Sequence, residues 1–358
     1  MNSSEIRKSC KKYLPGQYPQ SPKQYFEEMA KYTGTAVAAD VYGQGKFLNE
    51  FEGEVAQILG KEAAVFMPSG VMAQQIALRI WADQTGIQNI AYHPTCHLER
   101  EEFKAHQVLH GLNGITVGNQ HQLITVADLE TVAEPVAALL LELPQRRIGG
   151  LLPEWDDLLA TREWVDDRSA FMHLDGARLW ESQPYYQKSY SEICDLFDSV
   201  YISFYKGLGG MSGAMLAGDE SFIEEAKIWQ RRHGGNLYQQ FPFVIHAKSV
   251  FENRLPKMQA YHEKAVELAA VLNEFEGITL KPNEPQANMF HIFLNGELDQ
   301  LLAARNKVAQ EKGVWLFNAL VTTQLPRCYN SEIAIGDAGL DLSADELRKA
   351  LTLLAESL

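Results

Sequence analysis

Residues Val200 to Gly210 read VYISFYKGLGG, in which an apolar strand runs directly into Lys206 and a glycine-rich turn. Most lysines lie on the solvated surface, and that ordinary interpretation applies to this one as well. A lysine held at the end of a buried strand can instead form a Schiff base with a carbonyl group. Glycines beside it leave room for a bulky ligand. The stretch is therefore typical either of a surface lysine or of a covalent attachment point.

A second apolar strand, Phe171–Leu174, leads into a carboxylate and then a guanidinium, within the segment HLDGAR at residues 173–178. Asp175 could face a pyridinium nitrogen and keep that ring protonated and electron-withdrawing. Arg178 could bind a carboxylate through two parallel hydrogen bonds. Taken alone, the segment is equally typical of a structural Asp–Arg pair at a turn.

A third strand end is the segment FMPSGVM at residues 66–72, where a strand, a Ser-Gly turn and the start of a helix follow one another. The free N–H groups of a helix N-terminus suit a phosphate, and Gly70 lets it approach closely. Taken alone, a plain N-cap at Ser69 is the favoured interpretation. Parallel sheets, however, place their ligands at the carboxyl ends of strands. A phosphate cradle, a strand-end Asp and a strand-end Lys together match what pyridoxal phosphate requires.

Short apolar strands alternate with amphipathic helices up to about residue 220, which predicts an α/β fold with a parallel sheet. Examples are the helix Phe47–Leu59, which Gly60 ends, and the strands Ala63–Met67 and Asn89–Tyr92. After residue 275 the order changes, with strands such as Val314–Thr322 and a final helix from Ala344, which predicts a small α+β domain. We expect an N-terminal segment packing on the domains or on a dimer partner (1–45), a large cofactor-binding domain (46–245) and a small C-terminal domain (246–358).

The 358 residues are 46% apolar and 22% charged, a composition typical of globular proteins. The net charge of −14 argues against nucleic acid or an anionic membrane as a partner and favours a small molecule. No apolar run is long enough to span a bilayer, and the N-terminus lacks the apolar core of a secretory signal. Four scattered cysteines fit neither a zinc site nor a disulfide framework. These features predict a cytoplasmic protein.

Four stretches carry a resemblance to a known family: DVYG at 40–43, KEAAVF at 61–66 with PSG at 68–70, HLDGAR at 173–178 and KGLG at 206–209. In this order they resemble the L-threonine aldolase branch of the β-eliminating lyase family of fold-type-I pyridoxal-phosphate enzymes. The similarity runs from about residue 38 to 245 and continues more weakly to the C-terminus. It implies a large domain with a mostly parallel sheet flanked by helices, and a small C-terminal α+β domain.

The resemblance also implies a role for each matching residue. Lys206 would be the Schiff-base lysine, and Asp175 would pair with the pyridine nitrogen. Ser69, Gly70 and the N–H of Val71 would hold the phosphate. Arg178 would contact the substrate carboxylate beside the cofactor. The further substrate-binding candidates are Tyr42 and Arg327.

His97 lies where the family places an imidazole that stacks on the pyridine ring and takes part in acid–base chemistry. The alternative is a metal pair with His93, since the two residues have the i,i+4 spacing of a zinc site on a helix. Pro94 between them and the lack of a glutamate after His93 speak against that alternative. We expect no bound metal.

Several positions depart from the family pattern. Val71 stands where the family has a threonine, Tyr205 where it has a small hydroxyl residue, and Tyr238 where an arginine reaches the phosphate of a neighbouring subunit. The Glu-Asn-Thr-His stretch of the family becomes ELPQRR at residues 142–147. The C-terminal arginine that binds the substrate carboxylate aligns with Ala334, and Arg327 or Arg146 could replace it.

The resemblance implies a carbon–carbon lyase that cleaves a β-hydroxy-α-amino acid to glycine and an aldehyde, with pyridoxal 5′-phosphate on Lys206. His97 would remove the β-hydroxyl proton directly or through a water. The alternatives are β-elimination, racemisation or transamination on the same cofactor, and a non-catalytic cofactor-binding protein. A dinucleotide enzyme is disfavoured, because no G-x-G-x-x-G follows a first strand. Enzymes of this fold share active sites between subunits, which implies a homodimer or homotetramer.

Overall fold

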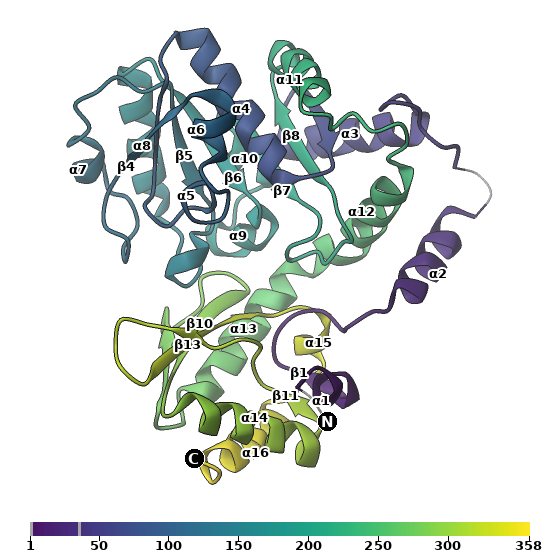
Figure 1. The fold of residues 1–358 in the computed structure, drawn as a ribbon, viewed down its shortest axis with the longest axis vertical. Helices are drawn as coiled ribbons and strands as arrows, with labels where there is room; N and C mark the ends of the chain where they lie inside the picture. The colour runs from purple at the N-terminus through teal and green to yellow at the C-terminus, as the bar shows by residue number, and fades with distance from the viewer. Residues whose placement is uncertain (1–2, 35–36) are drawn as a thin grey trace. The chain divides into compact units, whose positions relative to one another are not determined.

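The computed structural model describes residues 3–34 and 37–358 (Figure 1). Residues 1–2 and 35–36, which belong to the expected N-terminal segment 1–45, lie outside the described residues. The chain forms two compact units. Unit 1 comprises residues 1–21, 149–151 and 256–358, and unit 2 comprises residues 22–148 and 152–255.

Unit 2 is built on a seven-stranded sheet in the order β2-β8-β7-β6-β5-β3-β4. Strands β3, β4, β5, β6 and β7 run parallel, whereas β8 is antiparallel to both of its neighbours, β2 and β7. The expected mostly parallel sheet is therefore confirmed, and its carboxyl ends lie along one edge. The strands are β2 (Ala63–Met67), β3 (Asn89–Tyr92), β4 (Asn113–Thr116), β5 (Ala138–Glu142), β6 (Phe171–Gly176), β7 (Ser199–Ser203) and β8 (Ala214–Gly218).

Helices flank this sheet (Figure 1), and α4 is the one that fixes the site. Its Trp81 lies between two rings, with centroids 4.0 Å from Phe171 and 4.5 Å from Phe222, and donates a 2.8 Å hydrogen bond to Ser199 Oγ. The stacked rings exclude water and hold the helix on the sheet. The helices of unit 2 are α2 (Pro22–Thr33), α3 (Lys46–Leu59), α4 (Gly70–Thr85), α5 (His97–Arg100), α6 (Ala105–His110), α7 (Val126–Leu129), η1 (Arg146–Ile148), α8 (Trp155–Asp167), α9 (Leu179–Tyr186), α10 (Tyr190–Cys194), α11 (Glu220–Arg232) and α12 (Phe241–Arg254), with η2 (Leu255–Lys257) at the boundary.

Unit 1 contains an antiparallel sheet in the order β12-β13-β10-β9 and a parallel pair, β1 with β11. The single strand expected over Val314–Thr322 is wrong: residues 316–320 separate β11 from β12, because Leu316 and Phe317 turn into the hydrophobic core. The elements are α1 (Ser3–Ser9), β1 (Lys12–Tyr13), α13 (Met258–Leu272), β9 (Ile278–Lys281), β10 (Met289–Asn295), α14 (Leu298–Lys312), β11 (Val314–Trp315), β12 (Val321–Thr322), β13 (Cys328–Ala334), α15 (Asp337–Leu340) and α16 (Ala344–Ala355).

The chain passes from unit 2 to unit 1 after Leu255, at the end of α12. A division at residue 245 would cut this helix, in which Val244, Ile245 and Ala247 are buried. The domain boundaries expected from the sequence, after residues 45 and 245, stay predictions.

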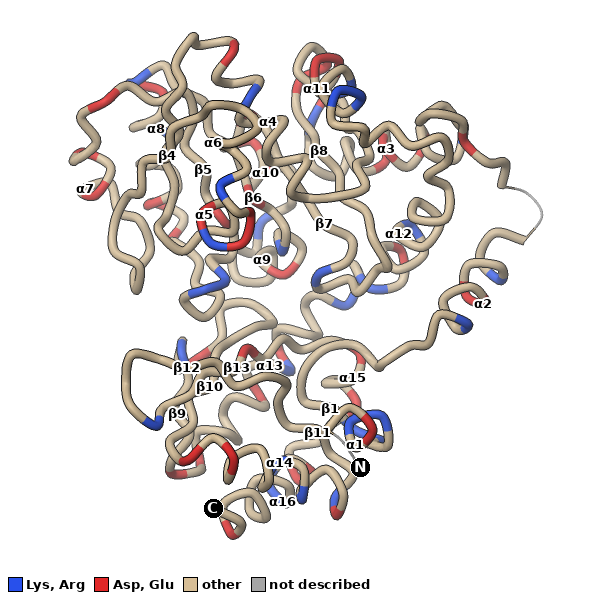
Figure 2. Tube along the Cα trace, in the orientation of Figure 1, with Lys and Arg blue, Asp and Glu red and all other residues tan. Residues whose placement is uncertain are grey.

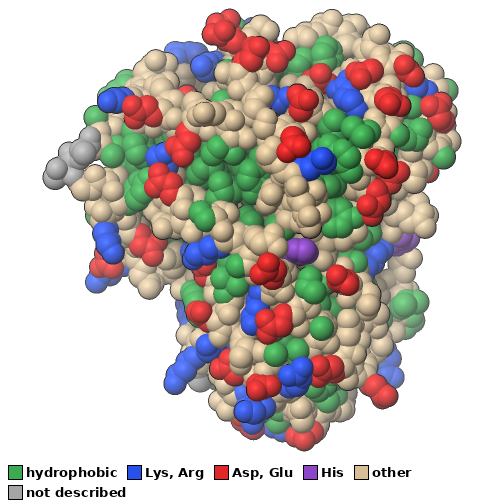
Figure 3. Space-filling model, turned by 180° about the vertical axis from the view of Figure 1, so that it is seen from behind, with side chains coloured by type: hydrophobic (Ala, Val, Ile, Leu, Met, Phe, Trp, Pro, Cys, Tyr) green, Lys and Arg blue, Asp and Glu red, His purple; other side chains and the backbone are tan. Residues whose placement is uncertain are grey.

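The negative net charge is spread over the surface. Both signs occur together on elements such as α5 and α11 (Figure 2). On the opposite face, charged side chains of both signs are scattered with apolar side chains between them (Figure 3). Within residues 3–34 and 37–358, none of the helices has the length and apolar character needed to cross a lipid bilayer.

Candidate active site

The N-terminus of α4 forms an anion cradle. Ser69 is the N-cap, in extended backbone conformation, and its hydroxyl makes no capping hydrogen bond. A Cβ atom on Gly70 would lie 1.9 Å from Tyr201 Oη, so only glycine fits there. The N–H groups of the first turn, including that of Val71, are not used within the helix. The site therefore fits a phosphate, with Val71 able to contribute only its backbone.

Asp175 lies at the carboxyl end of β6 with 1% of its surface exposed. Gln74 Nε2 donates a 2.7 Å hydrogen bond to Oδ2, and the N–H of Ala177 donates one of 3.1 Å to Oδ1. The two donors, one on each oxygen, fix the orientation of the carboxylate. Gln74 belongs to the same helix as the cradle, so the two parts of the site are joined directly.

A second carboxyl group, that of Glu142 on β5, lies in register beside Asp175. Burial and the negative charge of Asp175 raise the pKa of Glu142 to about 7, against the opposing effects of the Arg146 N–H and the Arg178 charge. A negative charge on Asp175 therefore favours the protonated form of Glu142. In the sequence, Glu142 is noticeable only as part of the stretch at residues 142–147 that departs from the family pattern. Its position beside Asp175 could not be predicted, because the two residues lie on different strands.

His97 begins α5, and its side chain is 29% exposed. Its Nδ1 lies 2.9 Å from Oε1 of the buried Glu102, whose Oε2 accepts a 2.5 Å hydrogen bond from Gln75 Nε2. Burial raises the pKa of Glu102, whereas the contacts with His97 and Gln75 lower it. An ionised Glu102 would hold the proton on Nδ1 and leave Nε2 as the proton acceptor.

His93 does not pair with His97 as a metal ligand. Its Nε2 lies 3.0 Å from the carbonyl oxygen of Asn119 and 2.8 Å from that of Gln122, and its Nδ1 accepts the N–H of Thr95 at 3.1 Å. Nε2 thus contacts the loop before α7, whereas Nδ1 contacts the chain just after β3. Throughout the described residues, no three His, Cys, Asp or Glu side chains converge in a way suited to a metal ion.

Lys206 lies in a tight turn directly after β7. The turn is closed by hydrogen bonds from the Gly209 N–H to the Lys206 carbonyl (2.9 Å) and from the Gly210 N–H to the Phe204 carbonyl (2.7 Å). Lys206 is half-buried, with Nζ 5.2 Å from the centre of the Tyr205 ring. Tyr205 Oη in turn lies 3.4 Å from Tyr201 Oη, the hydroxyl that packs against the cradle. The lysine turn is therefore in contact with the phosphate cradle.

Beneath this turn lies a carboxyl group that the sequence did not point to. Glu181 on α9 is 1% exposed, and a Cβ on Gly207 would lie 1.8 Å from its Oε1. Burial raises the pKa of Glu181 to about 7, and the positive charge of Arg178 opposes the shift. Arg178 is half-buried at the N-cap of α9. Glu181 and Gly207 are 26 residues apart in the sequence, and only the tertiary fold brings them together.

We expect Glu181→Gln to alter how stability depends on pH. The pKa of Glu181 in the folded state lies above its ordinary value of 4.5. Glu181 therefore stabilises the protein fully when the pH is below 4.5, and this stabilisation is lost as the pH rises through about 7. Glutamine does not titrate, so from about pH 5 to about pH 8 the variant should gain about 3 kcal/mol over the wild type in free energy of unfolding. Urea unfolding at several pH values measures this. The exposed Glu163→Gln is the control, and parallel curves for wild type and Glu181→Gln would contradict the expectation.

The remaining substrate-binding candidates are Tyr42 and Arg327. Tyr42 is 49% exposed on unit 2; its N–H donates to the Tyr238 carbonyl at 2.9 Å, and the two rings pack edge to face. Arg327 belongs to unit 1, is exposed and forms a 2.9 Å ion pair with Glu297. The residues that unit 2 places at the carboxyl ends of its strands are Ser69, Gly70, Val71, His97, Asp175, Arg178 and Lys206.

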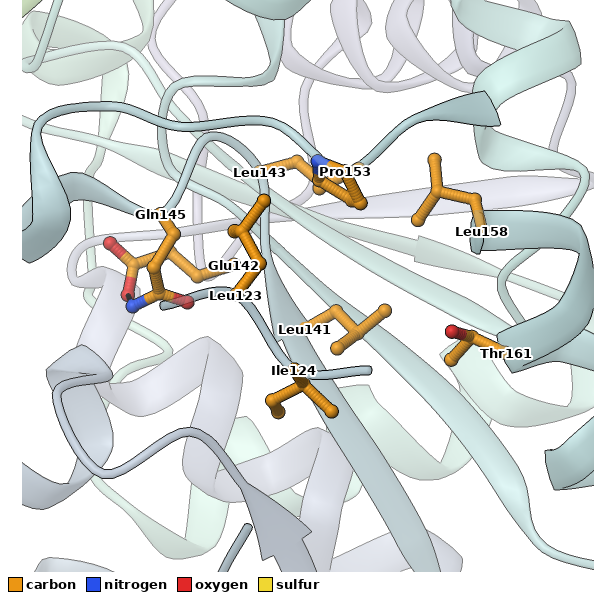
Figure 4. A pocket seen from close by; sticks show the side chains of 9 residues that line it. All are labelled: Leu123, Ile124, Leu141, Glu142, Leu143, Gln145, Pro153, Leu158 and Thr161. Carbon is orange, nitrogen blue, oxygen red and sulfur yellow. Dashed lines mark hydrogen bonds between the residues drawn. The ribbon is translucent and has the colours of Figure 1, made fainter. Parts of the chain in front are cut away.

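An open pocket of about 340 Å³ lies at the end of β5 (Figure 4). Glu142 and Gln145 lie together on one side of it, and Gln145 Nε2 donates to Glu142 Oε2 at 3.1 Å. Apolar side chains line most of the rest. The pocket thus shares Glu142 with the group around Asp175. Its lining residues are Leu123, Ile124, Leu141, Glu142, Leu143, Gln145, Pro153, Leu158 and Thr161.

Comparisons with known proteins agree with this geometry. The family model described as β-eliminating lyase matches residues 24–294. The low-specificity L-threonine aldolase 1 of Arabidopsis thaliana is 28% identical over 291 residues, covering 77% of this chain and 80% of that protein. The low specificity L-threonine aldolase of Escherichia coli K12 is 28% identical over 294 residues, covering 75% and 82%.

Solved structures match over the whole chain. A Listeria monocytogenes protein assigned as an L-allo-threonine aldolase is 40% identical, with a TM-score of 0.95 and coverage of 100% of both chains. An Exiguobacterium protein assigned as an aromatic amino acid β-eliminating lyase/threonine aldolase is 37% identical, with a TM-score of 0.93 and coverage of 99% of both chains.

Proposed function

Because this chain belongs to the β-eliminating lyase family, we propose that it cleaves a β-hydroxy-α-amino acid to glycine and an aldehyde, as a threonine aldolase does. It is a lyase that depends on pyridoxal 5′-phosphate. The observation that carries the proposal is the joining, within unit 2, of the cradle at Ser69–Gly70, the strand-end Asp175 and the turn at Lys206.

The residues of this chain have separate tasks in holding the cofactor. Ser69 and the N–H groups of Gly70 and Val71 would bind its phosphate, Asp175 would face its ring nitrogen, and Lys206 would hold it covalently through Nζ. When bound, pyridoxal phosphate supplies an electron sink for the bond that is broken. The contacts from Gln74 and Ala177 keep the Asp175 carboxylate in one orientation.

His97 is the proton acceptor that the geometry favours. With Nδ1 held by Glu102, Nε2 would take the β-hydroxyl proton of the substrate directly or through one water. Arg178 would bind the substrate carboxylate, since a guanidinium matches a carboxylate with two parallel donors. Neither role needs a residue from unit 1.

We further propose that the protein acts as a homo-oligomer, a dimer or a tetramer. Tyr42 and Tyr238 support this: they pack against each other while 49% and 60% exposed, which leaves an aromatic pair at the surface for a neighbouring subunit. Substrate contacts by Tyr42 and Arg327 stay predictions.

The decisive experiment incubates the cofactor-loaded enzyme with four β-hydroxy-α-amino acids: L-threonine, L-allo-threonine, one with an aromatic substituent, and L-serine. L-Alanine, which has no β-hydroxyl, is the comparison. Glycine, aldehyde, ammonia and keto acid are measured together. We expect equal amounts of glycine and aldehyde from the β-hydroxy substrates. Ammonia with a keto acid and no glycine would contradict aldol cleavage and favour β-elimination, whereas a keto acid formed without ammonia would favour transamination.

A further inference from the structure

We propose that Gln74 and Gln75, neighbours on α4, are positioning residues with separate targets. Gln74 would set Asp175 against the cofactor ring, and Gln75 would set Glu102 and, through it, His97. This inference rests on the proposed function and deepens it, because it assigns a role to two residues that would act through Asp175 and Glu102.

Gln74 is 1% exposed, and its Nε2 donates a 2.7 Å hydrogen bond to Asp175 Oδ2. The N–H of Ala177 holds the other oxygen at 3.1 Å. The Ala177 N–H lies only two residues after Asp175 in the sequence. Gln74, in contrast, lies on a helix 101 residues away from Asp175 in the sequence. Gln74 therefore fixes the Asp175 carboxylate relative to the helix that begins at the phosphate cradle.

Gln75 is also 1% exposed, and its Nε2 donates a 2.5 Å hydrogen bond to Glu102 Oε2. The other oxygen of Glu102 lies 2.9 Å from His97 Nδ1. One carboxylate thus joins α4 to the imidazole. Since successive residues on a helix point about 100° apart, the two glutamines reach different targets from one rigid element.

The chemistry of the helix supports a role beyond packing. The neighbouring positions Ala73, Ile76, Ala77 and Leu78 are buried and apolar. Oε1 of each glutamine is buried and accepts no hydrogen bond from the described part of the chain. Burying two amides in this apolar stretch costs free energy, which their hydrogen bonds to Asp175 and Glu102 offset.

Gln74→Met and Gln75→Met test the inference, and each serves as the matched control of the other. Methionine keeps the length of the side chain and removes the donor. For Gln74→Met we expect the dissociation constant of pyridoxal phosphate to rise about tenfold, the cost of one hydrogen bond to a charged group. The pH at which the visible band of the lysine-bound cofactor changes should also move, while the acid limb of the kcat/KM profile stays in place.

For Gln75→Met we expect the opposite pattern. The titratable groups that interact with Glu102 include His97, Asp175, Cys96 and Tyr201, and Gln75 helps to lower the pKa of Glu102. Its loss should move the acid limb of kcat/KM to higher pH by about half a unit to one unit and lower kcat about tenfold. The dissociation constant of pyridoxal phosphate and the visible band should stay as in the wild type.

The pattern across the two variants decides the matter. If both variants change both properties alike, or neither changes any, the separate roles are wrong. If Gln74→Met does not fold, Gln74→Asn withdraws the same amide by one methylene and replaces it in the comparison. A wild-type enzyme that forms no visible cofactor band or cleaves no β-hydroxy-α-amino acid would overturn the proposed function itself, which is a different result.

Discussion

Lys206→Ala is expected to abolish both the visible absorbance of the bound cofactor and turnover. Lys206 follows β7 in a closed turn, half-buried and connected through Tyr205 and Tyr201 to the cradle, and alanine has no amine to form the covalent bond. Because the covalent attachment of the cofactor is lost, glycine release should fall to the background of the uncatalysed reaction. Absorbance spectra of the cofactor-loaded protein and glycine release from threonine measure the two effects.

Lys188→Ala is the matched control, because Lys188 lies on the same unit but its Nζ packs over Trp155, near Glu192. This variant should keep both the absorbance and the activity. A Lys206→Ala protein that retained both would overturn the central assignment. Retained binding of free cofactor without absorbance of the lysine-bound form would agree with it, since the cradle is formed by other residues.

Asp175→Asn is expected to lower kcat/KM by about 10²–10³-fold, the usual cost of removing one preorganised electrostatic contact. Asparagine keeps the size of the side chain but brings no negative charge to the ring nitrogen. The visible absorbance should shift as well, because the electronic state of the ring depends on that charge. Steady-state kinetics and spectra of the loaded protein measure both.

The exposed Asp195→Asn controls for the general effect of removing one negative charge from unit 2. An Asp175→Asn enzyme within about twofold of the wild type would show that the ring nitrogen needs no such partner. Because Gln74 can donate equally to an asparagine oxygen, the substitution changes the charge while leaving that contact possible.

Much of the fold follows from local pattern. The strands Ala63–Met67 and Asn89–Tyr92 are present with the expected bounds, and Gly60 ends α3 in the left-handed conformation with φ of 66°. These features depend on neighbouring residues alone. The helix α2 was not expected, although Tyr25, Met29 and Tyr32 recur at helical spacing, and Met29 is the one residue of this helix that is buried. The antiparallel direction of β8 was likewise not predicted, since strand direction is set by pairing.

Strand ends followed by Ser69, Asp175 and Lys206 could be found in the sequence because each residue lies directly after an apolar strand. The hydrogen-bond partners that orient the site residues could not be found in the sequence. Gln74 reaches Asp175 across 101 residues, and Gln75 reaches Glu102 across 27. In the sequence, the two glutamines are neighbouring polar residues inside an amphipathic helix, and nothing indicates their hydrogen-bond partners.

The sequence by itself determined the α/β class and the cofactor, and it predicted the residues that would touch the cofactor. It could do so because a strand end, a helix start and a candidate catalytic side chain lie within a few residues of one another. The tertiary structure alone decided which carboxyl groups neighbour one another and which amides orient them. Strand pairing brings Glu142 beside Asp175, and burial together with that negative charge raises the pKa of Glu142. Glu181 lies beneath Gly207, and burial raises its pKa against the opposing charge of Arg178.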